Sequence, residues 1–289
     1  MKQIGFIGLG MMGFPMAGRL VAAGLDVLAY DVVPETTRRF AAEHAGAKVA
    51  ASLQDFGGCE VLVTMLPNSD IVDATVQQLT AVLPAGALVI DMSSADPVRT
   101  RSLAEAVAAA GKVMIDAPVS GGVSRAQTGK LAIMAGGEAA EVERARPLLA
   151  HLGSTITHVG AIGAGHAMKA LNNYVSAAGL IATAEALVAG QRFGIDPNVM
   201  VDVLNSSTGK NNTTENKARQ FMLSGAFNSG FSLALMAKDV AIAAALAEAV
   251  HASTQLGAHV SAMCNQASEA LGKAADHTEV YRFAQQHKA

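Results

Sequence analysis

A glycine-rich turn near the N-terminus restricts the possible folds more than any other stretch of the sequence. Residues 8–13 read G-x-G-x-x-G and directly follow a short apolar run, residues 2–7. A helical pattern comes next, and a second apolar run, residues 26–30, ends at Asp31. This order of strand, glycine turn, helix, strand and acid predicts a βαβ unit that binds a dinucleotide.

Each glycine of the turn has its own physical role in such a unit. Gly8 permits the tight turn, Gly10 lets the backbone approach a pyrophosphate, and Gly13 allows the helix to pack closely on the strand. The pyrophosphate then lies on unpaired backbone N–H groups at the positive end of the helix. The alternative interpretation, a flexible loop, is disfavoured by the flanking strand and helix. The turn residues expected to contact the cofactor are Gly8, Leu9, Gly10, Met11, Met12 and Gly13.

Asp31 determines which dinucleotide we expect. A carboxylate at the end of the second strand accepts hydrogen bonds from the ribose hydroxyls and repels a 2′-phosphate. Val32 and Val33 follow it and supply no arginine for that phosphate. The sequence therefore predicts NAD rather than NADP as the cofactor. The alternative role for Asp31 is that of a helix N-cap.

Further apolar runs continue the alternation of strand and helix. They cover residues 61–66, 87–90, 112–115, 131–135 and 154–158 and predict a doubly wound α/β domain. Ligands of a parallel sheet lie at the carboxyl ends of its strands. We therefore expect Leu66, Pro67 and Ser94 to line the nicotinamide and its ribose. Ser93 and Ser94 could equally cap the next helix, which would begin after Asp96.

The strand predicted at residues 112–115 leads into the segment DAPVSGG. A hydroxyl group and consecutive glycines at a strand end can form a nest of backbone donors, which suits a carboxylate. Ser120, Gly121 and Gly122 are therefore candidates for binding an acidic substrate.

The pattern of the sequence changes at about residue 163, after which almost nothing resembles a strand. A long helix is predicted at about residues 165–193, and alanine-rich helices at 231–248 and 253–273. The predicted fold is an α/β Rossmann-type N-terminal domain, residues 1–162, joined by this long helix to an all-α C-terminal domain, residues 163–289.

The long helix carries the candidate catalytic residues. Lys169, Asn172 and Asn173 are spaced at i, i+3 and i+4 and therefore share one face. A lysine can donate a proton to an alkoxide or, when neutral, accept a proton from a hydroxyl group. Burial and a nearby helix N-terminus both disfavour its charged form. The alternative is a lysine whose ammonium group reaches from a domain boundary to solvent.

Composition excludes several other classes of protein. The net charge is −3 and aromatic residues make up 4%, so neither a basic stripe nor stacking platforms indicate nucleic-acid binding. No apolar run is long enough for a transmembrane helix, and we expect no membrane partner. Cys59 and Cys264 are far apart in sequence and suggest reduced, buried thiols of a cytoplasmic protein. The histidines show no metal-binding spacing, so no metal is expected.

Four motifs resemble those of the β-hydroxyacid dehydrogenases and occur in the family's order. They are GFIGLGMMGFPMA, DAPVSGG, GAGHAMKALNN and LMAKD, and the resemblance extends over essentially the whole chain. The family includes 3-hydroxyisobutyrate dehydrogenase and tartronate semialdehyde reductase. The resemblance implies that Lys169 is the general acid/base and that Asn173, with Asn172 beside it, orients the substrate. It also implies that the loop of Ser120, Gly121 and Gly122 holds the substrate carboxylate. It further implies that Lys238 in LMAKD contacts both cofactor and substrate. Without the resemblance, Lys238 would be interpreted as an exposed helix lysine paired with Asp239.

The resemblance implies an NAD-dependent oxidoreductase that acts on a small 3-hydroxy acid, with 3-hydroxyisobutyrate or a close analogue as the first candidate. The alternatives are a reductase of tartronate semialdehyde or of a sulfonated aldehyde acid. An imine reductase is disfavoured by Lys169, and a catalytically silent nucleotide-binding module would be expected to lack this lysine. The expected partners are a small hydroxy acid or aldehyde acid and further copies of the chain, in a homodimer or homotetramer.

Overall fold

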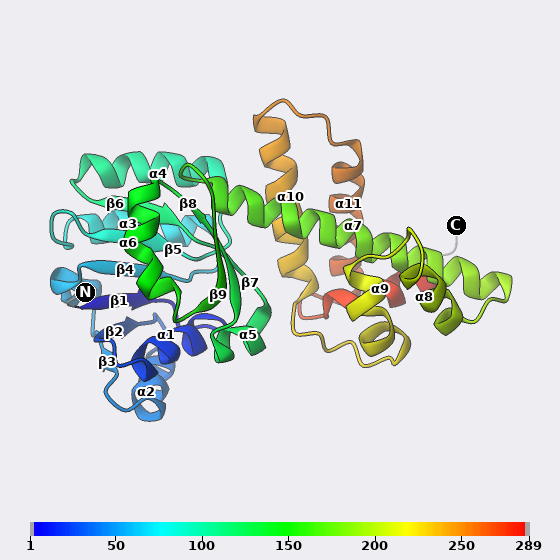
Figure 1. Ribbon diagram of the computed structural model, residues 1–289, viewed down its shortest axis with the longest axis horizontal. Helices are drawn as coiled ribbons and strands as arrows, with labels where there is room; N and C mark the ends of the chain where they lie inside the picture. Colours follow the sequence, from blue (N-terminus) through cyan, green and yellow to red (C-terminus); the bar gives the residue numbers. More distant parts are fainter. Residues whose placement is uncertain (1–2, 287–289) are drawn as a thin grey trace. The chain divides into compact units, whose positions relative to one another are not determined.

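The protein is described by a computed structural model that covers residues 3–286. The chain forms two compact units, Met1–Lys169 and Ala170–Ala289, which we describe separately. Figure 1 shows the sheet of the first unit and the helices of the second.

The first unit is built on a mixed sheet that is parallel over most of its width. Six parallel strands follow the order β3-β2-β1-β4-β5-β6, the strand order of a dinucleotide-binding domain. Beyond β6, β8 pairs antiparallel to β6 and β7, whereas β9 pairs parallel to β8. The strands are β1 (Ile4–Ile7), β2 (Val27–Tyr30), β3 (Lys48–Val49), β4 (Val61–Thr64), β5 (Leu88–Asp91), β6 (Val113–Asp116), β7 (Val119–Ser120), β8 (Leu131–Gly136) and β9 (Gly153–Gly160).

Helices cover both faces of this sheet, which explains why its strands are continuously apolar. Along β4, Val61 and Val63 contact one core and Leu62 contacts the other. The first core includes residues of α1 (Gly13–Ala22), α2 (Pro34–Glu43), α5 (Gly122–Thr128) and α6 (Ala139–Leu149). The second includes residues of the 3-10 helix η1 (Leu53–Gly58), α3 (Ser69–Thr80) and α4 (Pro97–Ala109).

A helix of 30 residues, α7 (Ala164–Phe193), follows β9. Its length is about 45 Å at 1.5 Å per residue. Gly163 precedes α7 with a φ of 85° and Gly194 follows it with a φ of 101°, a conformation that glycine adopts without strain. Both ends of the helix are therefore fixed by the local sequence.

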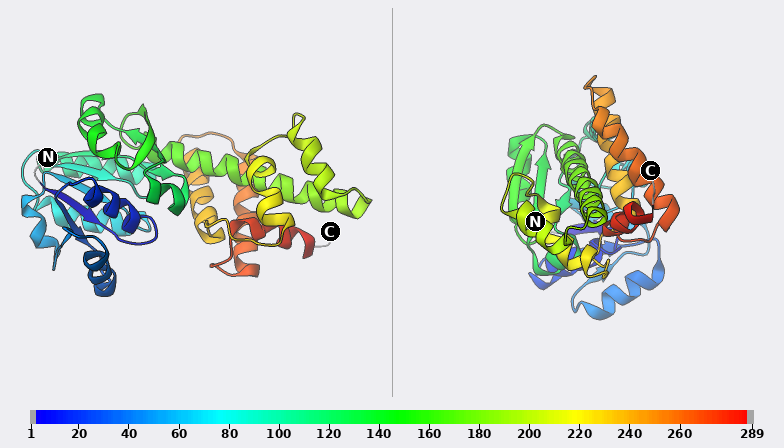
Figure 2. Two further views of the ribbon diagram at one scale, coloured as in Figure 1. Left: turned by 60° about the horizontal axis from the view of Figure 1, so that its bottom comes forward. Right: turned by 90° about the vertical axis from the view of Figure 1, so that its right-hand side faces the viewer.

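The second unit packs around the later turns of α7. Figure 2 shows this helix from the side in the left view and nearly end-on in the right view. Leu180, Ala184 and Leu187 of α7 are buried in its core together with residues of α8 (Pro197–Asn205), the π-helix η2 (Ala218–Leu223), α10 (Leu233–Ala249), α11 (Gln255–Leu271) and α12 (Val280–Gln286). The unit also contains α9 (Asn212–Asn216) and the 3-10 helix η3 (His277–Glu279). The predicted fold class is confirmed.

Two further findings concern predictions made from composition. Within residues 3–286, no helix combines the length and the apolar character needed to cross a membrane. Cys59 and Cys264 are both buried and both free, as expected. Burial raises the pKa of each thiol to about 11, so both remain protonated at neutral pH.

Candidate active site

The glycine turn after β1 has the geometry that a dinucleotide requires. Gly8 has a φ of 95°, and a Cβ atom there would lie 2.3 Å from the carbonyl oxygen of Met65. A Cβ atom on Gly13 would lie 1.9 Å from the carbonyl oxygen of Gly8. A Cβ atom on Gly10 would meet nothing within 4 Å, so the backbone there faces open space. The turn thus fits an NAD pyrophosphate, with Leu9 buried beneath it and Met11 exposed beside it.

Asp31 is bound to this turn by its own carboxylate. Its Oδ2 accepts a hydrogen bond from the backbone N–H of Leu9 at 2.7 Å, and its Oδ1 accepts one from Val33 at 2.9 Å. Val33, not Asp31, occupies the N-cap position of α2. The carboxylate therefore connects the glycine turn to the end of β2, where a ribose would lie. Arg38 is paired with Glu35 at 2.8 Å on the exposed side of α2.

The candidate nicotinamide residues follow β4 and β5 at the carboxyl edge of the sheet. The backbone N–H of Leu66 donates a hydrogen bond to Ser93 Oγ at 2.9 Å, which joins the two strand ends. Pro67 is exposed and Ser94 is half-buried. Asp96 caps α4 by accepting hydrogen bonds from Val98 and Arg99. The N-cap alternative for Ser93 and Ser94 is therefore not the arrangement found.

The candidate carboxylate loop lies between β7 and α5. Ser120 ends β7, and Gly121 and Gly122 have φ values of 133° and 67°. Both glycines are exposed, and a Cβ atom on Gly121 would lie 2.6 Å from Arg125 Cδ. The loop therefore depends on glycine at a place where the backbone faces solvent.

Lys169, Asn172 and Asn173 are half-buried on one face of α7. Asn172 donates a hydrogen bond from Nδ2 to Asn173 Oδ1 at 3.1 Å. Asn173 in turn donates from Nδ2 to Oδ2 of Asp239 in α10. The two asparagines are thus oriented as one hydrogen-bonded chain.

Asp239 is a further candidate for the site, which the sequence pattern alone does not reveal. Its side chain is 3% exposed, and its Oδ1 lies 3.7 Å from Lys238 Nζ. It therefore contacts both the asparagine and the lysine that the family motifs identify in the second unit. Asp239 is the last residue of the LMAKD motif and directly follows Lys238. The motif alone does not reveal that Asp239 contacts Asn173.

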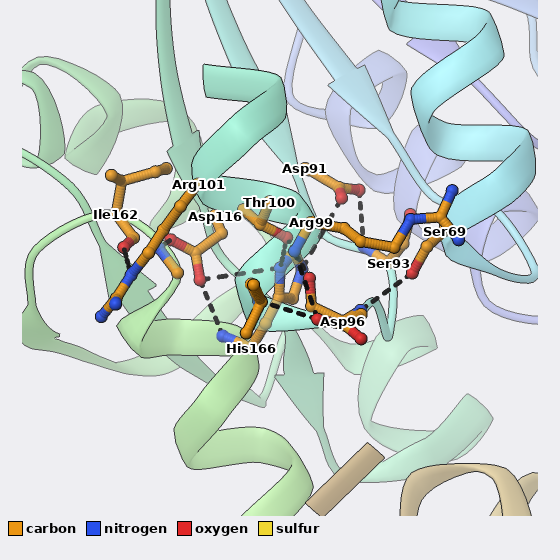
Figure 3. Close-up of polar contacts among 12 residues, drawn as sticks. Ser69, Asp91, Ser93, Asp96, Arg99, Thr100, Arg101, Asp116, Ile162 and His166 are labelled. Carbon is orange, nitrogen blue, oxygen red and sulfur yellow. Dashed lines mark hydrogen bonds and ion pairs between the residues drawn. The ribbon is translucent and has the colours of Figure 1, made fainter. Parts of the chain in front are cut away.

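A second group of residues, which the sequence patterns do not indicate, lies under the first turn of α7 (Figure 3). Asp91 ends β5, Asp116 ends β6, and His166 lies in α7; the side chains of all three are fully buried. Asp116 accepts backbone hydrogen bonds from Gly163 and His166, both at 2.7 Å. Burial raises the pKa of Asp116, while the facing His166 and these two hydrogen bonds oppose the rise.

The polar segment of residues 210–215 has local structural roles in the second unit. Lys210 Nζ lies 3.0 Å from Glu215 Oε1, and Asn211 caps α9 by accepting hydrogen bonds from Thr213 and Thr214. Asn211 also donates a hydrogen bond to Thr183 of α7. These contacts account for several of the polar residues without a ligand.

Comparison with known proteins identifies the family of both halves of the chain. Residues 3–160 match the family model described as the NAD binding domain of 6-phosphogluconate dehydrogenase. Residues 163–284 match the model described as NAD-binding of NADP-dependent 3-hydroxyisobutyrate dehydrogenase.

Individual relatives cover most of the chain. A 3-hydroxyisobutyrate dehydrogenase of Pseudomonas aeruginosa is 39% identical over 267 residues, which is 89% of each chain. A 2-(hydroxymethyl)glutarate dehydrogenase of Eubacterium barkeri is 38% identical over 249 residues, covering 83% of this chain and 81% of the relative.

A solved structure agrees over nearly the full length. The 3-hydroxyisobutyrate dehydrogenase of Mycobacterium tuberculosis, determined with L-serine, superposes with a TM-score of 0.92 at 34% identity and covers 98% of this chain and 99% of that one. The glycine turn, the strand order and these relatives lead to one conclusion. The chain belongs to the β-hydroxyacid dehydrogenase family and is an NAD-dependent hydroxyacid dehydrogenase.

Proposed function

We propose that this enzyme interconverts a small 3-hydroxy acid and the corresponding aldehyde acid, with 3-hydroxyisobutyrate or a close analogue as substrate and Lys169 as general acid/base. The observation that carries the proposal is the placement of Lys169 on the same half-buried face of α7 as Asn172 and Asn173. The resemblance of GAGHAMKALNN to the family motif supports the proton-transfer role of this lysine.

Each candidate residue has a separate task in the proposed reaction. NAD, when bound, supplies the hydride acceptor or donor. Lys169 accepts the proton of the substrate hydroxyl during oxidation and returns it during reduction. Asn173, held by Asp239, orients the hydroxyl, and the loop of Ser120, Gly121 and Gly122 binds the carboxylate. Lys238 of the LMAKD motif, by the same resemblance, contacts the cofactor and the substrate.

We also propose that the enzyme prefers NAD to NADP. The carboxylate of Asp31 is fixed at the end of β2 by the N–H groups of Leu9 and Val33. A 2′-phosphate placed there would meet a negative charge with no arginine next to it in sequence.

Replacing Lys169 with alanine tests the acid/base assignment. We expect kcat to fall by a factor of at least about 100, because general acid–base catalysis contributes roughly 10²–10⁴-fold, while NAD affinity is retained. Lys48→Ala is a matched control because Lys48 is an exposed lysine of β3 paired with Asp26. Turnover of the Lys169 variant close to that of wild type would refute the proposed role.

A panel of substrates tests the identity of the acid. The panel contains 3-hydroxyisobutyrate, L-serine and 2-(hydroxymethyl)glutarate, which all carry a hydroxymethyl group on the carbon that bears a carboxylate. It also contains tartronate semialdehyde, tested in the direction of reduction. We expect the highest kcat/KM with 3-hydroxyisobutyrate, measured through nicotinamide absorbance. L-Serine is the second candidate because it is the ligand of the similar structure from Mycobacterium tuberculosis. Absence of turnover with every member of the panel would overturn the proposed substrate class.

We further propose that the chain forms a homodimer or homotetramer. Leu171 and Val175 are 39% and 67% exposed and lie one turn apart on α7, so they form an apolar strip that a second copy could cover. Val175→Glu should shift the mass measured by light scattering toward that of one chain. An unchanged mass would show that this strip is not the interface.

A further inference from the structure

A histidine in the first turn of α7 contacts two carboxylates that the proposed mechanism does not use. His166 Nε2 lies 3.6 Å from Asp91 Oδ2, and His166 Nδ1 lies 3.7 Å from Asp116 Oδ2. All three side chains are excluded from solvent. Figure 3 shows His166 between the two strand ends that carry these carboxylates.

The contacts of Nδ1 indicate that this nitrogen carries a proton. Thr100 Oγ1 lies 2.8 Å from Nδ1 and also donates its hydroxyl proton to the carbonyl oxygen of Asp96 at 2.9 Å. A hydroxyl group has only one proton. Because Thr100 donates it to the backbone carbonyl oxygen of Asp96, Oγ1 acts as the acceptor of a hydrogen bond from Nδ1. Asp116 Oδ2 is a second acceptor near the same nitrogen.

The surroundings of Nε2 indicate a second proton. Within residues 3–286, neither His166 Nε2 nor Asp91 Oδ2 has a hydrogen-bond partner, and these two atoms face each other. Without a proton, two lone pairs would be buried against each other, which costs free energy. The other oxygen of Asp91 accepts hydrogen bonds from Thr64 and Ser93, so the two oxygens of this carboxyl group face different partners.

We propose that His166 is an imidazolium held between Asp91 and Asp116, and that it is a positioning residue for Lys169, which follows one turn later in α7. The claim concerning Lys169 rests on the proposed function. Asp116 holds the backbone of the same turn through Gly163 and His166, so the cluster fixes the start of the helix in both its backbone and its side chain.

The charges around the cluster determine its effect on Lys169. β5 contributes Asp91, β6 contributes Asp116, and α4 contributes Thr100 and Arg101, whose guanidinium binds the carbonyl oxygen of Ile162 at 3.3 Å. With a cationic His166, the two carboxylates and the imidazolium sum to one negative charge. His166→Asn would leave the two negative charges of Asp91 and Asp116 beneath the helix. Asp91→Asn would leave only the negative charge of Asp116, because His166 would then become neutral.

Nuclear magnetic resonance of the full chain with ¹⁵N-labelled histidine, recorded without NAD, tests the protonation state directly. We expect both ring nitrogens of His166 to be protonated at pH 7 in the wild type. In Asp91→Asn, Nε2 should lose its proton and accept a hydrogen bond from the new amide. An unprotonated Nε2 in the wild type, or a proton retained in the variant, would overturn the charge assignment.

The pH dependence of alcohol oxidation tests the effect on Lys169. In His166→Asn the extra negative charge should stabilise the ammonium form of Lys169 and move the midpoint of the kcat/KM profile upward. At pH values below that midpoint, kcat/KM should fall by about tenfold, as one charge roughly 10 Å away at an effective dielectric constant of about 20 predicts. Asp91→Asn and the double variant, which keep the net charge, should retain the wild-type midpoint.

The outcomes separate this inference from the proposed function. A loss of rate in His166→Asn that is equal at every pH would indicate a purely structural role and would overturn the positioning claim. An active Lys169→Ala would overturn the function of Lys169 but not the charge state of His166. If His166→Asn does not fold, the resonances of the wild type and of Asp91→Asn still decide the charge assignment.

Discussion

Asn173 donates a hydrogen bond to Asp239, 66 residues later in the chain, with Nδ2 and Oδ2 2.5 Å apart. Asp239 is almost completely buried, whereas Asn173 is half-buried and can present its remaining polar groups to a ligand. The orientation of Asn173 therefore depends on a carboxylate that is itself withdrawn from solvent.

We expect Asp239→Asn to reduce kcat/KM by roughly tenfold to a hundredfold, because a hydrogen bond to a charged group contributes about 1.5–3 kcal/mol. The new amide is neutral, so the charge-assisted hydrogen bond that holds Asn173 would be replaced by a weaker one. Steady-state kinetics with 3-hydroxyisobutyrate measure the effect. Glu269→Gln, an exposed change on α11, is the control. Kinetics within twofold of wild type would show that Asp239 does not orient Asn173 for catalysis.

The two glycines Gly10 and Gly13 should respond differently to substitution by alanine. Gly10→Ala should keep the stability of the wild type and weaken NAD binding, because its Cβ meets no protein atom and occupies the space next to the turn. Gly13→Ala should destabilise the first unit by about 1–3 kcal/mol, because its Cβ would lie 1.9 Å from the carbonyl oxygen of Gly8. Thermal unfolding and NAD titration separate the two effects, and full NAD affinity in Gly10→Ala would argue against a pyrophosphate at this turn.

Cofactor preference should change when the charge at the end of β2 is changed. Asp31→Ala combined with Val32→Arg should raise the ratio of NADP to NAD in kcat/KM by at least about tenfold, since a repulsive carboxylate is lost and a phosphate ligand is gained. Asp31→Ala alone separates the two contributions. A wild-type enzyme that already favours NADP would contradict the role given to Asp31.

Acid should destabilise the second unit through His277. Burial, together with the nearby Lys217 cation, lowers the pKa of this histidine to about 4. The unfolded chain takes up the proton at about pH 6.5, so the neutral folded form is favoured above that pH and loses its advantage as the pH falls toward 4. The loss amounts to about 3 kcal/mol in the free energy of unfolding.

Urea unfolding at pH 7 and pH 4.5 measures this loss, with His277→Asn as the comparison. Asparagine can still donate toward the carbonyl oxygen of Phe231, which lies 3.0 Å from His277 Nδ1, but it does not titrate. The variant should therefore be less sensitive to pH than the wild type over this interval. Equal sensitivity of the two proteins would rule out His277 as the cause.

The parts of the fold that local patterns determine could be predicted from the sequence. Strands such as Val61–Thr64 are continuous apolar runs, and α7 is flanked by Gly163 and Gly194, so both were expected close to their observed bounds. β3 and β7, with two residues each, were missed because so short a strand has no periodicity of its own.

The contacts that hold the candidate site could not be predicted in the same way. Asp91 and Asp116 were visible as acids at strand ends, but their partner His166 is 75 and 50 residues further along the chain (166 − 91 and 166 − 116). Nothing in the spacing of a single histidine distinguishes a buried ion-pair partner from a surface residue. Such pairings are determined by strand order and register, which the sequence pattern leaves open.

The first turn of α7 has a consequence for how the chain can vary in length. An α-helix advances by about 100° per residue, so one residue inserted between His166 and Lys169 would turn every later side chain of α7 away from its present direction. Because Asp116 and His166 hold the start of the helix in place, the insertion could not be absorbed there. The number of residues from Gly163 to Asn173 therefore determines the direction of Lys169 and Asn173. We expect this segment to tolerate substitutions far better than insertions or deletions.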